Sequence, residues 1–202
     1  MLTDRKNDDD TPPLKVADSG FLFGQLLVAT PSVQGGCFER SVVFVSAHDA
    51  SGAFGIIVNK ELKNVDSKQM LETMGITVPK KFSGIPIFLG GPVDTSRGFV
   101  IHSPEYTLKN TIKYPCGVAV TSEKQVLQDY IDGTGPKQAR LMMGYAGWTK
   151  DQAELELMES AWINFAGDKD IILGGNDDGK WQKVAADNGI NINKVLPIVG
   201  RD

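Results

Sequence analysis

Cysteine and histidine are scarce in this sequence of 202 residues, which has two of each. A disulfide framework or a four-cysteine zinc module needs several cysteines at short spacing, so Cys37 and Cys116 alone exclude both. A catalytic zinc ion normally takes three protein ligands. Here the two cysteines, His48 and His102 would have to converge from four separate segments. We therefore expect no metal site, and no motif points to another cofactor.

Long apolar runs are also absent. No stretch approaches the roughly 20 apolar residues that cross a bilayer as a helix. The first six residues lack the apolar segment of a secretory signal. The sequence therefore predicts a cytoplasmic protein that has no membrane partner.

An excess of basic charge is the third absence. Aspartate and glutamate outnumber lysine and arginine by 25 to 21, which gives a formal net charge of -4. Affinity for the phosphate backbone of DNA needs clustered lysine and arginine. No helix-turn-helix with a basic second helix can be recognised either. Direct, sequence-specific DNA binding is therefore not expected.

The rest of the composition is typical of a globular protein, with 41% hydrophobic and 23% charged residues. A chain of this length can bury one sizeable core. Residues 1–18 differ, because they are rich in charge, contain Pro12-Pro13 and offer almost no apolar side chain, so we predict a disordered tail. No repeat, linker or charge block divides the remainder. Residues 19–202 are predicted to form a single domain.

Short β-branched or aromatic runs between Gly, Pro and Asn predict eight strands, and four other segments have helical patterns. The predicted strands are Gly24–Ala29, Ser41–Ala47, Gly55–Asn59, Ile85–Leu89, Gly98–His102, Gly117–Thr121, Ala139–Tyr145 and Asp170–Leu173. The predicted helices are Ser67–Met74, Ser122–Asp132, a helix that begins after Thr149, and Asp178–Asn188. Early strands follow one another through short glycine turns, whereas later ones alternate with helices. This order favours a mixed sheet at the centre of the fold.

The helix after Thr149 can be explained by capping and packing alone. Thr149 and Gln152 have the spacing of a capping box. Its apolar side is predicted to consist of Ala153, Leu157, Met158, Ala161 and Trp162. A solvated acidic side is predicted from Glu156 and Glu159, which are three residues apart and so share a face of the helix. We therefore expect this helix to be mainly structural.

The segment Gly174–Lys180 matches the first seven positions of a phosphate-binding P-loop. The eighth position is Trp181, where the motif has Ser or Thr to hold magnesium, and Asp177 and Asp178 would repel phosphates. A turn that leads into the last predicted helix explains these residues without a ligand. Nucleotide binding at this loop is not expected.

A ligand site is predicted around the turn Gly90-Gly91-Pro92. Consecutive glycines let the backbone approach a ligand closely, and successive N–H groups can form an anion-binding nest. Arg97 would add a cation to such a nest. The alternative is a structural Gly-Pro turn in which Asp94 and Arg97 pair locally.

Six segments follow one another with ordinary spacing along the chain: Gly24–Pro31, Phe38–His48, Gly52–Lys60, Gly90–Val93, Arg97–Ser103 and Gly144–Trp148. They are followed by Gln152, Glu154, Glu156 and Trp162. Together, over about residues 21–189, these motifs resemble the bacterial YqgE/AlgH family. The chain departs from the family pattern at Asp151, Ala153 and Ser46-Ala47, which concern helix capping and strand edges rather than the fold.

The resemblance implies a single α+β domain whose sheet is twisted, mixed and mostly antiparallel. It also implies that this sheet is partly barrel-like and flanked by about four helices. It implies no established reaction. The family's common label, a regulator of alginate synthesis, comes from the genetic context of one member rather than from a shared DNA-binding motif.

Two functions remain open at this point. The first is a non-catalytic binding or regulatory domain for a small anionic ligand or a protein partner, because loops on a rigid sheet carry function. The candidate binding residues are Arg40, His48, Gly90, Gly91, Asp94, Arg97 and His102. The alternative is an enzyme that acts on a small anionic substrate. No pair of base and nucleophile can be named for it, so no catalytic residue is assigned.

Overall fold

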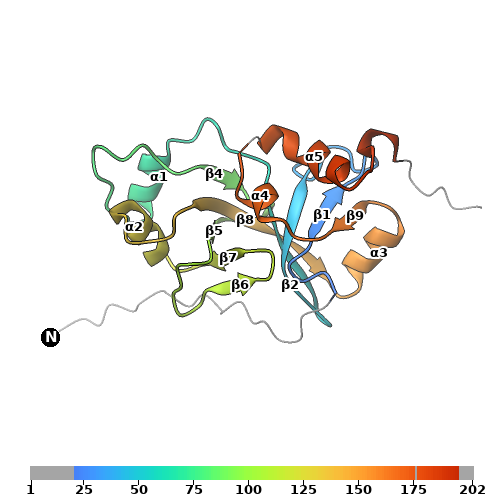
Figure 1. Ribbon diagram of the computed structural model, residues 1–202, viewed down its shortest axis with the longest axis horizontal. Helices are drawn as coiled ribbons and strands as arrows, with labels where there is room; N and C mark the ends of the chain where they lie inside the picture. The colour runs from blue at the N-terminus through green and yellow to red at the C-terminus, as the bar shows by residue number, and fades with distance from the viewer. Residues whose placement is uncertain (1–20, 176, 196–202) are drawn as a thin grey trace, which may run out of the picture.

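The computed structural model describes residues 21–175 and 177–195 as one α+β domain (Figure 1). The predicted tail, residues 1–18, and both ends of the predicted domain lie outside the described residues. The strands are β1 (Leu26–Ala29), β2 (Val42–Asp49), β3 (Gly52–Ile57), β4 (Ile87–Leu89), β5 (Val93–His102), β6 (Ile112–Tyr114), β7 (Val118–Thr121), β8 (Ala139–Thr149) and β9 (Trp162–Phe165). The helices are α1 (Ser67–Thr73), α2 (Gln125–Asp132), α3 (Gln152–Met158), α4 (Lys169–Ile172) and α5 (Lys180–Asp187), with short 3-10 helices η1 (Asp177–Gly179) and η2 (Ile192–Lys194).

The strands form a mixed, mostly antiparallel sheet in the order β6-β7-β5-β8-β3-β2-β1-β9. β4 joins β8 in parallel, with Phe88 opposite Met142. The two outer strands of this order, β6 and β9, do not pair with each other in the described part of the chain. This confirms the predicted α+β class and its mixed sheet, which is open rather than closed into a barrel.

β8 runs through the middle of the sheet and joins its two halves. In Figure 1, α1, α2 and β4–β7 lie towards one end of β8, and α3, α5, β1 and β9 lie towards its other end. Its first half pairs with β5, where Ala139 lies opposite His102, and its second half pairs with β3, where Thr149 lies opposite Gly52. Gly144 lies between the halves with a φ of 74°, a left-handed conformation that favours glycine.

The unbroken apolar run of β1 is buried on both of its faces. Successive side chains of a strand point to opposite faces. Leu26 and Val28 belong to a hydrophobic cluster with α4 and α5, whereas Leu27 and Ala29 belong to another with α3. A third cluster lies where α1 and α2 cover β5 and β8. Because helices cover both faces of the sheet, its central strands lack the alternation of a half-exposed strand.

Capping signals place the start of α1 correctly, whereas α3 begins at Gln152, two residues later than the capping box predicts. The Asp66 side chain accepts hydrogen bonds from the N–H groups of Lys68 and Gln69 at the start of α1, as the sequence predicts. At the start of α3, Gln152 Oε1 accepts a hydrogen bond from the Thr149 N–H at 3.0 Å. That contact is one half of the predicted capping box.

Two predictions on the C-terminal side are wrong. The apolar run Asp170–Leu173 forms α4 instead of a strand, because the Asp168 side chain caps it by accepting hydrogen bonds from two backbone N–H groups. Trp162 begins β9 instead of continuing the apolar side of α3, since the chain turns at Ser160, which has a left-handed φ of 59°. In addition, β6 has no counterpart among the predicted strands.

The predicted solvated acidic side of α3 is wrong for Glu156, one of its two glutamates. Glu156 Oε2 accepts hydrogen bonds from the indole N–H groups of Trp148 at 2.8 Å and of Trp162 at 2.7 Å. Glu154 Oε1 lies 2.8 Å from His48 Nε2. The two carboxylates therefore tie α3 to the sheet.

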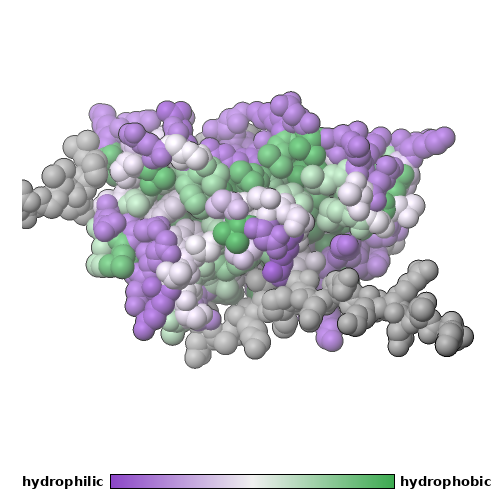
Figure 2. All heavy atoms as spheres, turned by 180° about the vertical axis from the view of Figure 1, so that it is seen from behind, coloured by the Kyte–Doolittle hydropathy of each residue, from purple (hydrophilic) through white to green (hydrophobic). Residues whose placement is uncertain are grey.

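In the described part of the chain, no helix is long and apolar enough to cross a membrane. Figure 2 shows hydrophobic residues across the middle of one face, with hydrophilic residues around them. Of the large hydrophobic side chains that are exposed, two, Leu155 and Met158, lie on α3, and the others come from separate segments: Phe21, Val65 and Val93.

Candidate functional site: a polar pocket beside β1 and α5

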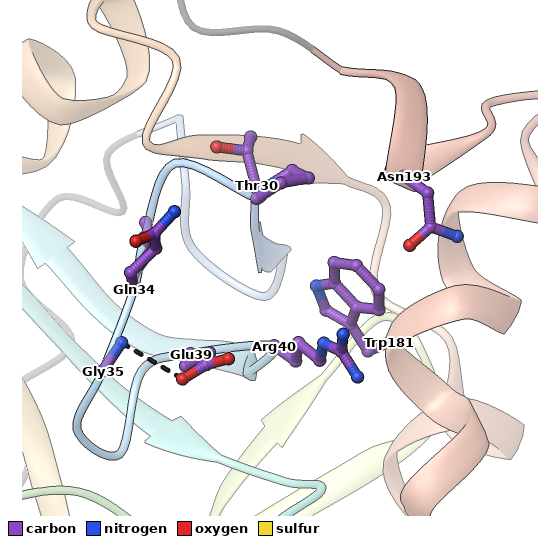
Figure 3. A pocket seen from close by; sticks show the side chains of 9 residues that line it. Thr30, Gln34, Gly35, Glu39, Arg40, Trp181 and Asn193 are labelled. Carbon is purple, nitrogen blue, oxygen red and sulfur yellow. Dashed lines mark hydrogen bonds between the residues drawn. The ribbon is translucent and has the colours of Figure 1, made fainter.

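A pocket of about 450 Å³ lies between the β1–β2 loop and the C-terminal helices (Figure 3). Its lining residues are Thr30, Pro31, Val33, Gln34, Gly35, Glu39, Arg40, Trp181 and Asn193. In Figure 3, Gln34 and Glu39 lie on the loop side, and Trp181 and Asn193 lie on the helical side. The volume falls in the range of roughly 300–1,000 Å³ that is usual for small-molecule sites.

Hydrogen bonds hold the β1–β2 loop at both ends. At its start, the Thr30 hydroxyl donates to the carbonyl of Ser160 at 2.7 Å. At its end, the buried Asn59 accepts from the Val42 N–H at 2.8 Å and donates to the carbonyl of Arg40 at 2.9 Å. Arg40 has a left-handed φ of 52°, a conformation that costs roughly 1–2 kcal/mol outside glycine. The Asn59 amide thus helps to hold Arg40 in a strained backbone position.

Trp181 forms the wall of the pocket opposite the loop. Its indole N–H donates to the carbonyl of Ala29 at 2.6 Å, and only 4% of the residue is exposed. The guanidinium carbon of Arg40 lies 5.4 Å from the centre of the Trp181 ring, which is a cation–π contact. Arg40 itself is exposed. Because the guanidinium is planar and stays charged, this contact orients a permanent cation at the pocket.

A buried ion network fixes the start of α5 and thereby Trp181. Asp177 Oδ1 lies 2.6 Å from Arg140 Nη1 and 2.5 Å from Lys180 Nζ. The Lys180 ammonium also contacts two backbone carbonyls. Burial lowers the pKa of Lys180 to about 8, although the hydrogen bond with Asp177 opposes this shift. The lysine of the P-loop-like segment is therefore engaged inside the protein.

The residues that line the pocket include one cation, Arg40, and one carboxylate, Glu39. Glu39 Oε2 accepts from the Gly35 N–H at 3.1 Å. The Lys60 ammonium, which is outside the lining, donates to the backbone carbonyl of Glu39 at 2.7 Å and so lies beside the loop.

Arg40 is the one sequence-predicted site residue that lines this pocket, and the structure does not bring the other six to it. Gly90 and Gly91 lie where the chain between β4 and β5 crosses β8. The Gly90 N–H donates to the carbonyl of Met143 at 2.7 Å. A Cβ atom on either glycine would overlap backbone carbonyl groups of β8. Both glycines thus permit a close approach of backbone to backbone.

Both histidines are buried and engaged at both ring nitrogens. His102 Nδ1 donates to the carbonyl of Ser103 at 2.9 Å, and its Nε2 accepts from the Thr121 hydroxyl at 2.8 Å. Burial lowers the pKa of His102, in keeping with a neutral imidazole. His48 contacts Glu154 through Nε2 and a backbone N–H through Nδ1. The described residues contain no group of three or more His, Cys, Asp or Glu side chains that could hold a metal ion.

Asp94 and Arg97 lie on β5, away from the pocket. Asp94 Oδ1 accepts from the Ser96 hydroxyl at 2.8 Å. The Arg97 guanidinium carbon lies 5.0 Å from the centre of the Phe99 ring. Among the described side chains, Asp94 and Arg97 do not form an ion pair with each other. Arg97 thus shares with Arg40 a cation–π contact but not the pocket, which makes it a matched control.

Sequence reasoning missed Gln34, Trp181 and Asn193 as pocket residues. Trp181 lies on the last predicted helix, and it is a buried core residue as well as a pocket residue. Gln34 precedes Gly35-Gly36, a turn signal that could have drawn attention to this loop. Only the tertiary fold brings residues 30–40 beside Trp181 and Asn193.

The fold and the pocket together describe a class of protein: an α+β domain with an open, mostly antiparallel sheet and a polar pocket at the end of β1. The chain belongs to the AlgH-like family (DUF179), whose model matches residues 26–193. The names of its relatives assign no reaction.

A UPF0301 protein of Bradyrhizobium diazoefficiens is 38% identical over 189 residues, which are 90% of this chain and 88% of that protein. A UPF0301 protein of Ruegeria pomeroyi is 40% identical over 163 residues, or 80% of this chain and 88% of its own. The solution structure of the AlgH protein from Pseudomonas aeruginosa matches with a TM-score of 0.74 and 28% identity, over 94% of this chain and 100% of that one. A crystal structure from Corynebacterium diphtheriae, with a TM-score of 0.68 and 17% identity over 85% of this chain and 89% of its own, shares the fold.

Proposed function

We propose that this AlgH-like chain is a non-catalytic binding domain for a small anionic ligand, and that the pocket at Arg40 is the binding site. The observation that carries the proposal is the exposed Arg40 side chain, which lines the pocket and whose guanidinium carbon lies 5.4 Å from the centre of the Trp181 ring. Arginine binds carboxylates and phosphates through two parallel hydrogen bonds. A cation that is oriented before the ligand arrives loses less conformational entropy on binding.

The other lining groups support an anion that also carries polar groups. Lys60 adds a second cation beside the loop. The amides of Gln34 and Asn193 can each donate and accept hydrogen bonds. Glu39 already accepts the Gly35 N–H, which offsets part of its repulsion of an anion.

The alternative function, an enzyme that acts on a small anionic substrate, has less support from the lining residues. Nucleophilic or acid–base catalysis needs a base within hydrogen-bond reach of its partner. The Thr30 hydroxyl donates to a backbone carbonyl, and no histidine, cysteine or lysine is among the residues described as lining the pocket. Binding therefore fits these side chains better than catalysis.

Isothermal titration calorimetry with small carboxylates and phosphates, such as citrate and ribose 5-phosphate, tests the proposal. Wild type and Arg97→Ala should bind at least one of them. Arg40→Ala should bind it at least about tenfold more weakly, because hydrogen bonds to charged groups contribute about 1.5–3 kcal/mol. The proposal fails if no anion binds. It also fails if Arg97→Ala loses binding while Arg40→Ala keeps it, which would place the site near Gly90 and Gly91.

The proposal also takes the protein to be cytoplasmic and to lack direct DNA recognition. The net charge of -4 supports the second point, since DNA affinity depends on clustered cations. Gel-shift assays should show duplex DNA binding only at low salt and without sequence preference. Tight, sequence-dependent binding at physiological salt would favour a transcriptional regulator instead.

A further inference from the structure

We infer that the anion bound at Arg40 carries a planar heteroaromatic ring close to its charged group, as a nucleoside monophosphate does; this inference rests on the proposed function. The first observation is that the Arg40 guanidinium is in cation–π contact with Trp181 and yet exposed. A guanidinium has two flat faces and a fork of N–H donors at its edge. A flat face that the indole does not cover can take a ring, while the edge takes an oxyanion.

The position of the amides favours a heteroaromatic ring over an aliphatic chain. Gln34 and Asn193 lie on opposite sides of the pocket in Figure 3, with Arg40 and Trp181 between them in the view. Side-chain amides pair well with the mixed donors and acceptors at the edge of a purine. The Glu39 carboxylate can accept a hydrogen bond from an amine or a hydroxyl of the same ligand.

The size of the pocket points in the same direction. A water molecule takes about 30 Å³ in the liquid, so inorganic phosphate, which is only a few times larger, would leave most of the 450 Å³ unfilled. A ligand that also has a sugar or a ring would exclude that water. The local charge suits a single phosphate better than a chain of two or three, because Arg40 is the one cation among the lining residues and Lys60 lies beside the loop.

This site differs from the P-loop-like segment Gly174–Lys180. There, the lysine contacts Asp177 and backbone carbonyls inside the protein. At Arg40, the cation contacts only an aromatic face among the described side chains and borders open space. The segment whose sequence resembles a phosphate-binding motif and the pocket whose geometry supports phosphate binding are thus two different sites.

Calorimetry with the full chain tests the inference, using AMP, ribose 5-phosphate, adenosine and inorganic phosphate as probes. AMP should bind at least about tenfold more tightly than ribose 5-phosphate, since base stacking contributes about 1–3 kcal/mol per base. Adenosine should also bind more weakly than AMP, because it lacks the anion. If ribose 5-phosphate binds as tightly as AMP, the anion site stands and the ring is wrong. If none of the probes binds, the inference is overturned, and the citrate titration then decides the proposed function separately.

The variant Arg40→Lys distinguishes the contribution of the planar guanidinium from that of its positive charge. Lysine keeps the cation but has no planar group, so the variant should lose most of the advantage of AMP over ribose 5-phosphate. Its affinity for ribose 5-phosphate should fall less than its affinity for AMP, because lysine keeps the charge but loses the paired hydrogen bonds of the guanidinium. Arg97→Lys is the matched control, and it should bind all probes like wild type. An equal loss of both ligands in Arg40→Lys would contradict stacking, and thermal unfolding would confirm that each variant is folded.

Discussion

Replacing Glu156 by alanine removes a carboxylate that holds three side chains at once. Its Oε2 accepts from the indole groups of Trp148 and Trp162, and its Oε1 accepts from the Gln152 amide at 2.8 Å. Trp148 is 7% exposed and Trp162 is 5% exposed, so neither indole N–H can readily turn to water. The variant should therefore fold with two buried donors that lack an acceptor.

The expected destabilisation follows from those two donors. A buried donor without a partner costs about 1–3 kcal/mol, so Glu156→Ala should lower the free energy of unfolding by about 3–5 kcal/mol. That is a large part of the roughly 5–15 kcal/mol that is typical of a domain. Glu156→Gln keeps an acceptor oxygen but loses the charge, so it should lose only about 1–2 kcal/mol.

Equilibrium urea unfolding, followed by both circular dichroism and tryptophan fluorescence, measures these differences. Coincident transitions would justify a two-state treatment. Glu159→Ala is the control, because this exposed glutamate lies on the same helix and should stay within about 0.5 kcal/mol of wild type. The reasoning is refuted if Glu156→Ala is as stable as Glu159→Ala.

Three further predictions concern the backbone, the buried ions and the pocket. Gly91→Ala should lose more than about 3 kcal/mol or fail to fold in thermal unfolding, because its Cβ would overlap the Tyr145 carbonyl, whereas Gly35→Ala meets nothing within 4 Å and should lose only about 1 kcal/mol. The pKa of Lys180 is about 8 in the folded protein against an ordinary 10.5, so the unfolded chain binds more protons between these values. The stability of wild type relative to Lys180→Met should therefore rise as the pH increases from 8 to 10, by at most about 3 kcal/mol, and parallel pH profiles would contradict this. Arg40→Gly should be about 1 kcal/mol more stable than Arg40→Ala in urea, since glycine tolerates the φ of 52°, and an equal stability would count against backbone strain.

Local signals in the sequence are sufficient where an element depends on its own residues. The helix at α1 can be predicted from Asp66 as N-cap and Gly75 as stop, and both contacts form. The same reasoning fails for β9, because Trp162 continues the apolar spacing of α3 and the break at Ser160 is a backbone conformation rather than a residue type that ends helices. It fails for Asp170–Leu173 because a four-residue apolar run fits either a strand or a helix.

The site is predictable only in part for a related reason. A pattern of residues can indicate that a glycine pair allows a close approach, but it does not show whether a ligand or a neighbouring strand makes that approach. At Gly90 and Gly91 the neighbour is β8. Likewise, the charge of Glu156 suggests solvent, whereas the indoles that it binds come from β8 and β9. Contacts between distant segments decide these cases, and a single sequence does not contain them.

Arg40 differs from the other residues that have a left-handed backbone. The remaining non-glycine residues with positive φ in the described chain are Asp94, Asp151 and Ser160. Their side chains are short and polar, and aspartate in particular tolerates this conformation because it can hydrogen-bond locally. Arginine has no such compensation, and its contact with Trp181 is worth only about 0.5–1 kcal/mol at an exposed site. A buried amide holds Arg40 at the wall of the pocket in a conformation that local stability does not favour. This strain supports the proposal that the guanidinium itself binds the ligand.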